Sequence, residues 1–401
     1  MKKVLSLLTA LLLILCLGGC LRPADGQIPP DSTAPVQTDT TADTTAPEPA
    51  PEPKPEPLDK SVTIRMVGDI LLHEAVTESG LKNDGSYSFD HLFANVKSEI
   101  EKADIALVNQ EVILGGSEMG LSGYPAFNGP FEVGDAIAGA GFDIVLHATN
   151  HALDRGSRAV VNCCNFWRTS HPEVSFIGIS DSAEKNNIVI KESKGIKIAF
   201  INYTYGTNGI PLPEGYPNAV TYLDAETIRS DTTYAKENAD FVVVCPHWGT
   251  EYTHEADSNQ KYWTQLFLEC GVDLVIGTHP HVTEPIEVLE QNGHSMTVYY
   301  SIGNFVNSTA QTGAGIADRM VGAMADVTLE RDSAGNVRIT DFGVIPLVTH
   351  LSEGYGGITT YKLSDYTEEM AQQNLIVASD PAFSLEYCKT LTEKVFGDLA
   401  K

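Results

Sequence analysis

Cysteine and basic residues are scarce in this 401-residue sequence, and each shortage excludes a class of protein. The seven cysteines include no C-x-x-C spacing, so neither a disulfide framework nor a cysteine-ligated zinc site is expected. Lysine and arginine number 26 against 53 aspartate and glutamate residues, giving a formal net charge of −27. This charge argues against nucleic acid or anionic lipid as a partner of the general surface. A polyanionic substrate would need a local positive site, which a metal ion could supply.

Two common catalytic motifs are also missing. The sequence has neither the G-x-S-x-G turn of a serine hydrolase nor the G-x-x-x-x-G-K loop that holds nucleoside phosphates. Any hydrolytic chemistry would therefore need another source of nucleophile.

The first 20 residues have the features of an export signal. MKKVLSLLTALLLILCLGGC combines two lysines, a short apolar stretch and small residues before a cysteine. Leu17-Gly18-Gly19-Cys20 resembles a bacterial lipoprotein cleavage site, so residues 1–20 are expected to be removed and Cys20 to carry the lipid. A plain signal peptide or an uncleaved anchor is the alternative. We expect the protein outside the cytoplasm, anchored to the cell membrane.

The rest of the chain divides by composition. Residues 21–58 consist mainly of Pro, Thr, Ala, Asp, Glu and Gln, with too few apolar residues to offset the entropy of ordering, and they predict a disordered tether. Residues 59–348 predict one large domain. Residues 349–401 have helical spacing and predict a helical C-terminal extension.

Short apolar runs alternate with helical patterns in the large domain. Helices are predicted over 132–141, 158–169 and 259–270. Turn sequences at Lys194-Gly195, Asn292-Gly293 and 334–336 predict hairpins, and hence a mixed sheet or a second sheet. The alternation predicts an α/β layered core. The strands are predicted over residues 62–67, 105–108, 143–146, 241–244 and 272–276.

Polar residues follow the end of each predicted strand, where sites form in open α/β sheets. The stretch GTHPHV contains two histidines that an extended backbone would place on one side of Pro280. Oxygen and imidazole donors without thiolates suit manganese, iron or zinc, and one or two such ions could activate water for hydrolysis. The residues in question are Asp69, His73, Glu111, Asn150, His151, Asp154, His247, Glu251, His279 and His281.

Six motifs, in this order, resemble the CapA family of capsule-synthesis proteins over roughly residues 62–347. The resemblance implies a layered sandwich of two mixed β-sheets flanked by helices, like that of calcineurin-like metallophosphoesterases. It also implies a role in making, exporting or retaining poly-gamma-glutamate, alongside membrane capsule-synthesis proteins. The motifs are Gly68-Asp69, Asn109-x-Glu111, Asn150-His151-x-x-Asp154, His247-Trp248-Gly249-x-Glu251-Tyr252, Gly277-x-His279-Pro280-His281 and Tyr300-Ser301-x-Gly303-Asn304-Phe305.

The resemblance assigns roles to individual residues. It implies that His151 is a proton donor to a leaving group, oriented by Asp154. Trp248 and Tyr252 are either core residues or part of a substrate pocket with Glu251 and Asn304. The ligands of one or two divalent ions would be Asp69, Glu111 as the bridging carboxylate, Asn150, His247, His279 and His281.

The sequence departs from these patterns at three places. On the second strand the phosphoesterases carry Gly-Asp-x-x-Asp, whereas this chain has Glu111 without the glycine. The phosphoesterases carry Asp-x-His on the first strand, whereas His73 follows Asp69 by four residues, so His73 is either a ligand or a solvated residue at a helix start. Position 284, where the family favours glutamine, is glutamate.

Three functions are consistent with the sequence. The first is a surface lipoprotein that assembles, tethers or trims an anionic polymer by metal-assisted hydrolysis or transfer. The second is an extracellular metal-dependent phosphodiesterase or phosphatase. The third is a non-catalytic polymer-binding module stabilised by metal.

Overall fold

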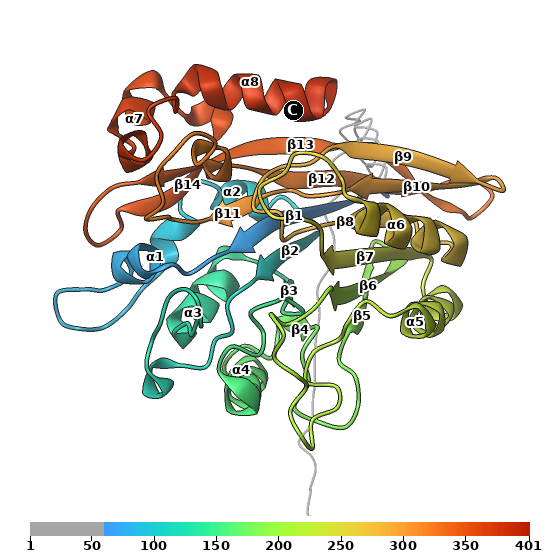
Figure 1. Ribbon diagram of the computed structural model, residues 1–401. Coiled ribbons are helices and arrows are strands. Elements are labelled where there is room, and N and C mark those ends of the chain that lie inside the picture. The colour runs from blue at the N-terminus through green and yellow to red at the C-terminus, as the bar shows by residue number, and fades with distance from the viewer. Residues whose placement is uncertain (1–59) are drawn as a thin grey trace, which may run out of the picture. The chain divides into compact units, whose positions relative to one another are not determined.

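The computed structural model describes residues 60–401 (Figure 1). The predicted signal peptide, the predicted lipid attachment at Cys20 and the predicted tether ending at residue 58 lie outside the described residues. Among residues 60–401, no helix combines the length and apolar character needed to cross a bilayer.

Fourteen strands and eight α-helices are assigned in residues 60–401. The helices are α1 (Glu74–Ser79), α2 (Lys97–Ile100), α3 (Phe131–Ala140), α4 (Gly156–Ser170), α5 (Ala225–Asn238), α6 (Ser258–Cys270), α7 (Glu368–Gln373) and α8 (Leu385–Phe396). The strands are β1 (Val62–Ile70), β2 (Ile105–Gln110), β3 (Ile144–Leu146), β4 (Ser175–Ile177), β5 (Ile188–Ser193), β6 (Ile196–Thr204), β7 (Phe241–His247), β8 (Leu274–Ile276), β9 (Ile286–Gln291), β10 (His294–Tyr299), β11 (Asn304–Val306), β12 (Val321–Arg331), β13 (Val337–Leu351) and β14 (Ile358–Lys362).

The strands form two mixed sheets, as predicted. The first has the order β14-β13-β12-β1-β2-β3-β4, with β11 also paired to β1. The second has the order β5-β6-β7-β8-β10-β9. The strands β1 to β4 are parallel, as are β6, β7, β8 and β10, so their carboxyl ends lie at one edge of each sheet. The three predicted hairpins are present as β5-β6, β9-β10 and β12-β13.

Apolar side chains fill three layers between and outside the sheets. Ile64 and Met66 of β1 pack in one cluster with Phe200 and Ile276 of the second sheet. The opposite face of the first sheet packs on α3 and α4, and that of the second sheet on α5 and α6 (Figure 1). Because both faces of the central parallel strands are covered, these strands are apolar at nearly every position, which is why they were recognisable in the sequence.

The C-terminal segment requires a correction. The predicted boundary at residue 348 falls inside β13, which extends to Leu351 and pairs with β14 in an antiparallel ladder. Residues 349–401 therefore supply an edge of the first sheet before they form α7 and α8. The two helices lie over β13 and β14 (Figure 1).

Candidate metal centre

The carboxyl ends of strands from both sheets bring the predicted residues together. Asp69 lies near the end of β1, and Glu111 follows β2 directly. The parallel register pairs Asp69 with Asn109, which places the two strand ends side by side. His247 is the last residue of β7 in the second sheet. Gly68 is required at this approach, because a Cβ there would lie 1.8 Å from the carbonyl oxygen of Gly303.

The two histidines of GTHPHV reach the centre by a route that the sequence did not predict. Their backbone is not extended, since His279 has φ of 102° and His281 has φ of 60°. The prediction of alternating side chains on an extended segment was therefore wrong. The backbone N–H of His279 donates to Asp69 Oδ2 at 3.1 Å, which holds this turn in the left-handed region. The two rings still approach each other, with centroids 5.8 Å apart.

Glu111, His279 and His281 form the tightest group of potential ligands. One ligand atom of each lies within 4.8 Å of the others, and all three residues are buried. Both carboxylate oxygens of Glu111 and Nδ1 of His279 have no hydrogen-bond partner among the described residues. Because a buried polar atom without a partner costs about 1–3 kcal/mol, this group fits a divalent cation as the missing partner.

The ionisation of the three residues suits cation binding. Burial holds the pKa of His279 well below its ordinary value, so the ring is a neutral ligand. Burial also raises the pKa of Glu111 well above its ordinary value, although the charge of His281 opposes the shift. For His281, burial alone would lower the pKa, but the charges of Glu111 and Asp69 outweigh it and raise the pKa to about 9. A divalent ion would replace the proton that these groups otherwise share.

Three more predicted ligands surround this group. Nε2 of His247 lies 3.8 Å from Glu111 Oε1 and 2.9 Å from Asn150 Oδ1, to which it donates. An ion could bind His247 and Asn150 only in exchange for this hydrogen bond. Asp69 accepts hydrogen bonds from Asn109 Nδ2 at 2.7 Å and from the backbone N–H of His279, so its carboxylate already has partners.

His151 and Asp154 are arranged as an oriented imidazole. Nδ1 of His151 lies 2.7 Å from Asp154 Oδ2, which also accepts the backbone N–H of Phe127 at 2.8 Å. The other ring nitrogen, Nε2, lies 4.0 Å from Glu111 Oε1. Since Asp154 fixes the proton on Nδ1 of the neutral ring, Nε2 faces the metal-ligand group and can exchange a proton there.

The remaining predicted residues occupy different positions. His73 lies beside the group with its pKa lowered to about 4 by burial and by the charges of His281, His151 and Arg319, but it is not one of the converging ligands. For Trp248 the structure favours the first of the two alternatives, because its side chain is buried in the core of the second sheet and donates from Nε1 to the carbonyl oxygen of Tyr300 at 2.9 Å. Tyr252 is 45% exposed, with its ring centroid 5.8 Å from that of His281.

Asn304 and Glu251 complete the predicted pocket. Oδ1 of Asn304 lies 3.0 Å from Nδ1 of His281, so this nitrogen carries the proton and Nε2 of the ring faces Glu111 Oε1 at 3.7 Å. Asn304 therefore orients His281 instead of lining an open surface. Glu251 is exposed, and its charge acts on the buried Glu111.

Comparison with known proteins identifies the family. Residues 63–309, from β1 to just beyond β11, match the family described as bacterial capsule synthesis protein PGA_cap. The chain belongs to this capsule synthesis family. The match includes every residue of the metal-ligand group and the His151–Asp154 pair, so the centre described above lies wholly within the family region.

Two curated relatives carry the same kind of name. The PGA biosynthesis protein CapA of Bacillus subtilis is 32% identical over 41% of this chain. The capsule biosynthesis protein CapA of Bacillus anthracis is 25% identical over 62% of this chain. The matches span 42% and 60% of the lengths of these two relatives.

Solved structures with a similar arrangement share little sequence with this capsule synthesis family member. A phosphatase from Mycoplasma pneumoniae has a TM-score of 0.42 and 15% identity, covering 72% of this chain and 94% of the phosphatase. A 5'-nucleotidase from Staphylococcus aureus has a TM-score of 0.45 and 13% identity, covering 71% of this chain and 54% of the nucleotidase.

The sequence interpretation assigned no role to three residues near the centre. Asn109, which stands in the quoted Asn109-x-Glu111 motif, binds Asp69. Tyr205 is 46% exposed, and its ring centroid lies 4.6 Å from that of His279. Arg319 stacks on Tyr252 with its Cζ 3.7 Å from the ring centroid. Only Asn109 carried a sequence signal, because Tyr205 and Arg319 stand outside the six family motifs.

Glu284, the departure from the family pattern, is buried away from the metal-ligand group. Its Oε2 accepts from Gln260 Nε2 at 2.5 Å, whereas Oε1 has no partner among the described residues. Burial raises the pKa of Glu284 to about 8, against an ordinary value of 4.5. A glutamine at this position would face Gln260 without a charge.

We expect Glu284→Gln to stabilise the protein in a pH-dependent manner. In the wild type, the unfolded carboxyl ionises near pH 4.5 while the folded one stays protonated to about pH 8, so stability falls as pH rises through this window. The variant should gain on the order of 5 kcal/mol in free energy of unfolding at pH 8.5 and almost nothing at pH 4.5, since each pKa unit corresponds to about 1.4 kcal/mol. Urea unfolding at both pH values measures this. Parallel pH profiles for the two proteins would contradict it.

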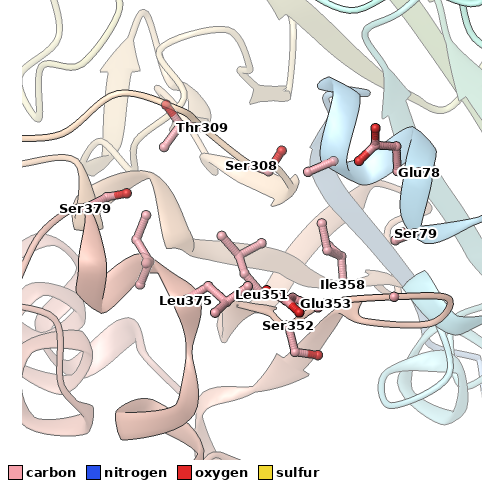
Figure 2. Close-up of a pocket in the computed structure, with 13 residues that line it drawn as sticks. Glu78, Ser79, Ser308, Thr309, Leu351, Ser352, Glu353, Ile358, Leu375 and Ser379 are labelled. Carbon is pink, nitrogen blue, oxygen red and sulfur yellow. The ribbon is translucent and has the colours of Figure 1, made fainter.

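An elongated hollow runs from His73 toward the C-terminal segment. The part beside His73 and Arg155 has a volume of about 880 Å³. It shares lining residues with a second cavity of about 470 Å³. Figure 2 shows Glu78 on one side of this second cavity and C-terminal residues, among them Leu351 and Leu375, on the other. The C-terminal segment, which lies beyond the family match, therefore forms one wall of a cavity near the centre.

Proposed function

We propose that this protein acts on a poly-gamma-glutamate-like capsule polymer at the bacterial surface, through hydrolysis or transfer assisted by one or two manganese, iron or zinc ions. The observation that carries the proposal is the buried group of Glu111, His279 and His281, of which one ligand atom each lies within 4.8 Å of the others, while both oxygens of Glu111 and Nδ1 of His279 have no partner among the described residues. Membership of the capsule synthesis family supports the polymer as the substrate.

Each residue of the site would have a separate role in the reaction. A divalent ion held by Glu111, His279 and His281 supplies Lewis-acid polarisation of the bond that is cleaved. Asn304 fixes the ring of His281 so that Nε2 faces Glu111. His151 would donate a proton from Nε2 to the leaving group from its doubly protonated form, in which Asp154 holds the Nδ1–H, and it would return to the neutral ring with the proton on Nδ1. Burial of these residues keeps water away and strengthens each electrostatic contact.

The proposal includes export and anchoring. The sequence before Cys20 supports removal of residues 1–20 and lipid attachment, and the composition of residues 21–58 supports a tether that holds the folded domain away from the membrane. A Cys20→Ser protein should leave the membrane fraction when cells are fractionated. A variant that stays membrane-bound would show that another anchor operates.

The test of function uses the purified, metal-loaded protein and two substrates. We expect cleavage of gamma-linked glutamate oligomers, seen as shorter chains by chromatography, and no turnover of a chromogenic phosphodiester. A chelator should stop the reaction, and manganese should restore it. Turnover of the phosphodiester alone would instead identify an extracellular metal-dependent phosphodiesterase. Binding of the oligomer without cleavage, with or without metal, would identify a non-catalytic module.

A further inference from the structure

Arg319 is a buried cation beside the metal centre. It lies in the 3₁₀ turn Ala317–Met320 between β11 and β12, beyond the residues that match the family. Only 9% of it is exposed. Its guanidinium packs on the ring of Tyr252, with Cζ 3.7 Å from the ring centroid. A cation held flat on an aromatic ring is fixed in orientation before any ligand arrives.

Among the residues that the structure describes, the guanidinium of Arg319 has no anionic partner. Within residues 60–401 it makes no ion pair and no hydrogen bond, and its Nε is buried without a partner. This is unexpected in a chain with 53 acidic and 26 basic residues, where carboxylates are abundant. Because an unpaired buried charge is costly, the arrangement indicates a site completed by an external anion.

Arg319 is coupled in position to the metal-ligand group. Its carbonyl oxygen accepts from Asn304 Nδ2 at 3.1 Å, and Oδ1 of the same Asn304 holds the ring of His281. Tyr252, on which the guanidinium lies, is the neighbour of His281 on the exposed side. The charge of Arg319 also contributes to the lowered pKa of His73. An anion bound to Arg319 would therefore lie next to the bond being cleaved.

The nearby cavity does not offer an equivalent site. Glu78 and Glu353 line it in Figure 2, and none of the described residues that line it is basic. Those carboxylates would repel an acidic polymer. Arg155 lines the adjoining hollow, but its guanidinium already donates to the carbonyl oxygens of Met119 and Gly120 and to Ser122 Oγ. The chemistry of recognition therefore points to Arg319, where planar nitrogen donors match the two oxygens of a carboxylate or a phosphate.

We propose that Arg319, stacked on Tyr252, binds an oxyanion of the substrate, the alpha-carboxylate of a glutamyl residue adjoining the cleaved bond. The carboxylate identity rests on the proposed function, whereas the oxyanion site rests on the geometry of Arg319. Arg319 thereby determines specificity for an acidic chain, because a neutral polymer would leave the guanidinium unpaired.

Equilibrium binding to the full chain tests this. The probes are a gamma-linked glutamate tetramer, the same tetramer with its alpha-carboxylates converted to amides, and inorganic phosphate, each titrated by calorimetry with manganese present. Arg319→Met should weaken tetramer binding by at least about tenfold. The affinity of Arg319→Lys should lie between those of the wild type and Arg319→Met, since lysine keeps the charge but lacks the planar pair of donors. The matched control is Arg229→Met, which replaces an exposed arginine of α5 and should leave tetramer affinity unchanged. Manganese content should be the same in all four proteins.

Each outcome supports the proposal or overturns it. Converting the alpha-carboxylates of the tetramer to amides should weaken its binding to the wild type. The loss of affinity should be smaller for Arg319→Met, because the two changes remove the same contact. Equal affinity of wild type and Arg319→Met for the tetramer overturns the proposal. If Arg319→Met does not fold, equal affinity of the wild type for both tetramers overturns it. If the wild type binds only phosphate, and binds it through Arg319, the oxyanion site stands and the polymer function fails. If phosphate binds equally well to the wild type and Arg319→Met and the tetramer does not bind, both the oxyanion site and the polymer function are overturned.

Discussion

Glu111→Gln is expected to abolish the stabilisation that manganese gives the wild type. In the wild type, manganese at about 100 times its dissociation constant should stabilise the fold by about 2.7 kcal/mol, which corresponds to about 4 °C in melting temperature for a domain of this size. The variant removes a negative charge from the converging ligands Glu111, His279 and His281. Thermal unfolding with manganese or chelator, together with elemental analysis, measures the effect.

The same substitution should have the opposite effect when metal is removed. Burial raises the pKa of Glu111 well above its ordinary value, so at neutral pH the metal-free fold is destabilised by a carboxyl that ionises freely only in the unfolded chain, and a neutral amide removes this cost. In chelator, Glu111→Gln should therefore melt at a higher temperature than the wild type. Glu284→Gln is the matched control, because it also neutralises a buried carboxyl but should keep the full response to manganese. A Glu111→Gln protein that retains both its metal and its response to metal would show that the ion binds elsewhere.

Much of the fold could be predicted because burial on both faces leaves a clear pattern. The five predicted strands match β1, β2, β3, β7 and β8 to within a few residues. The helices α3, α4 and α6 were predicted equally well. The edge of the first sheet was not, since β14 is a short strand, Ile358–Lys362, that pairs on one side only. One exposed edge and two partly buried residues leave no continuous apolar run to recognise.

The proximity of the site residues could be predicted from the topology of the sheets. Parallel strands direct their carboxyl ends to one edge, so Asp69, Glu111 and His247 had to approach each other once the strands were placed. The backbone of His279 was not predictable, because its left-handed conformation depends on a hydrogen bond to Asp69, 210 residues away in the chain. Arg319 carried no local signal either, since the role proposed for it depends on its forming no ion pair with any carboxylate of residues 60–401.

His151→Gln should reduce turnover of the polymer by on the order of 10²–10⁴-fold while leaving the metal in place. The reason is geometric, since His151 Nε2 faces Glu111 at 4.0 Å but the ring is not among the converging ligands. Initial rates of oligomer cleavage and manganese content, measured on the same preparation, separate the two effects. Loss of both together would make His151 a ligand instead of a proton donor.

Asp154→Asn distinguishes orientation from proton transfer at the same position. Asp154 Oδ2 accepts from His151 Nδ1 at 2.7 Å and from the backbone of Phe127, whereas an amide could turn its NH₂ group toward the ring. That turn would favour a proton on Nε2 in the neutral ring and remove the charge that stabilises the protonated one. Turnover should then fall, but less than in His151→Gln, because the ring stays in place and loses only the partner that orients it. Turnover equal to that of the wild type would mean that Asp154 does not orient His151 for the reaction.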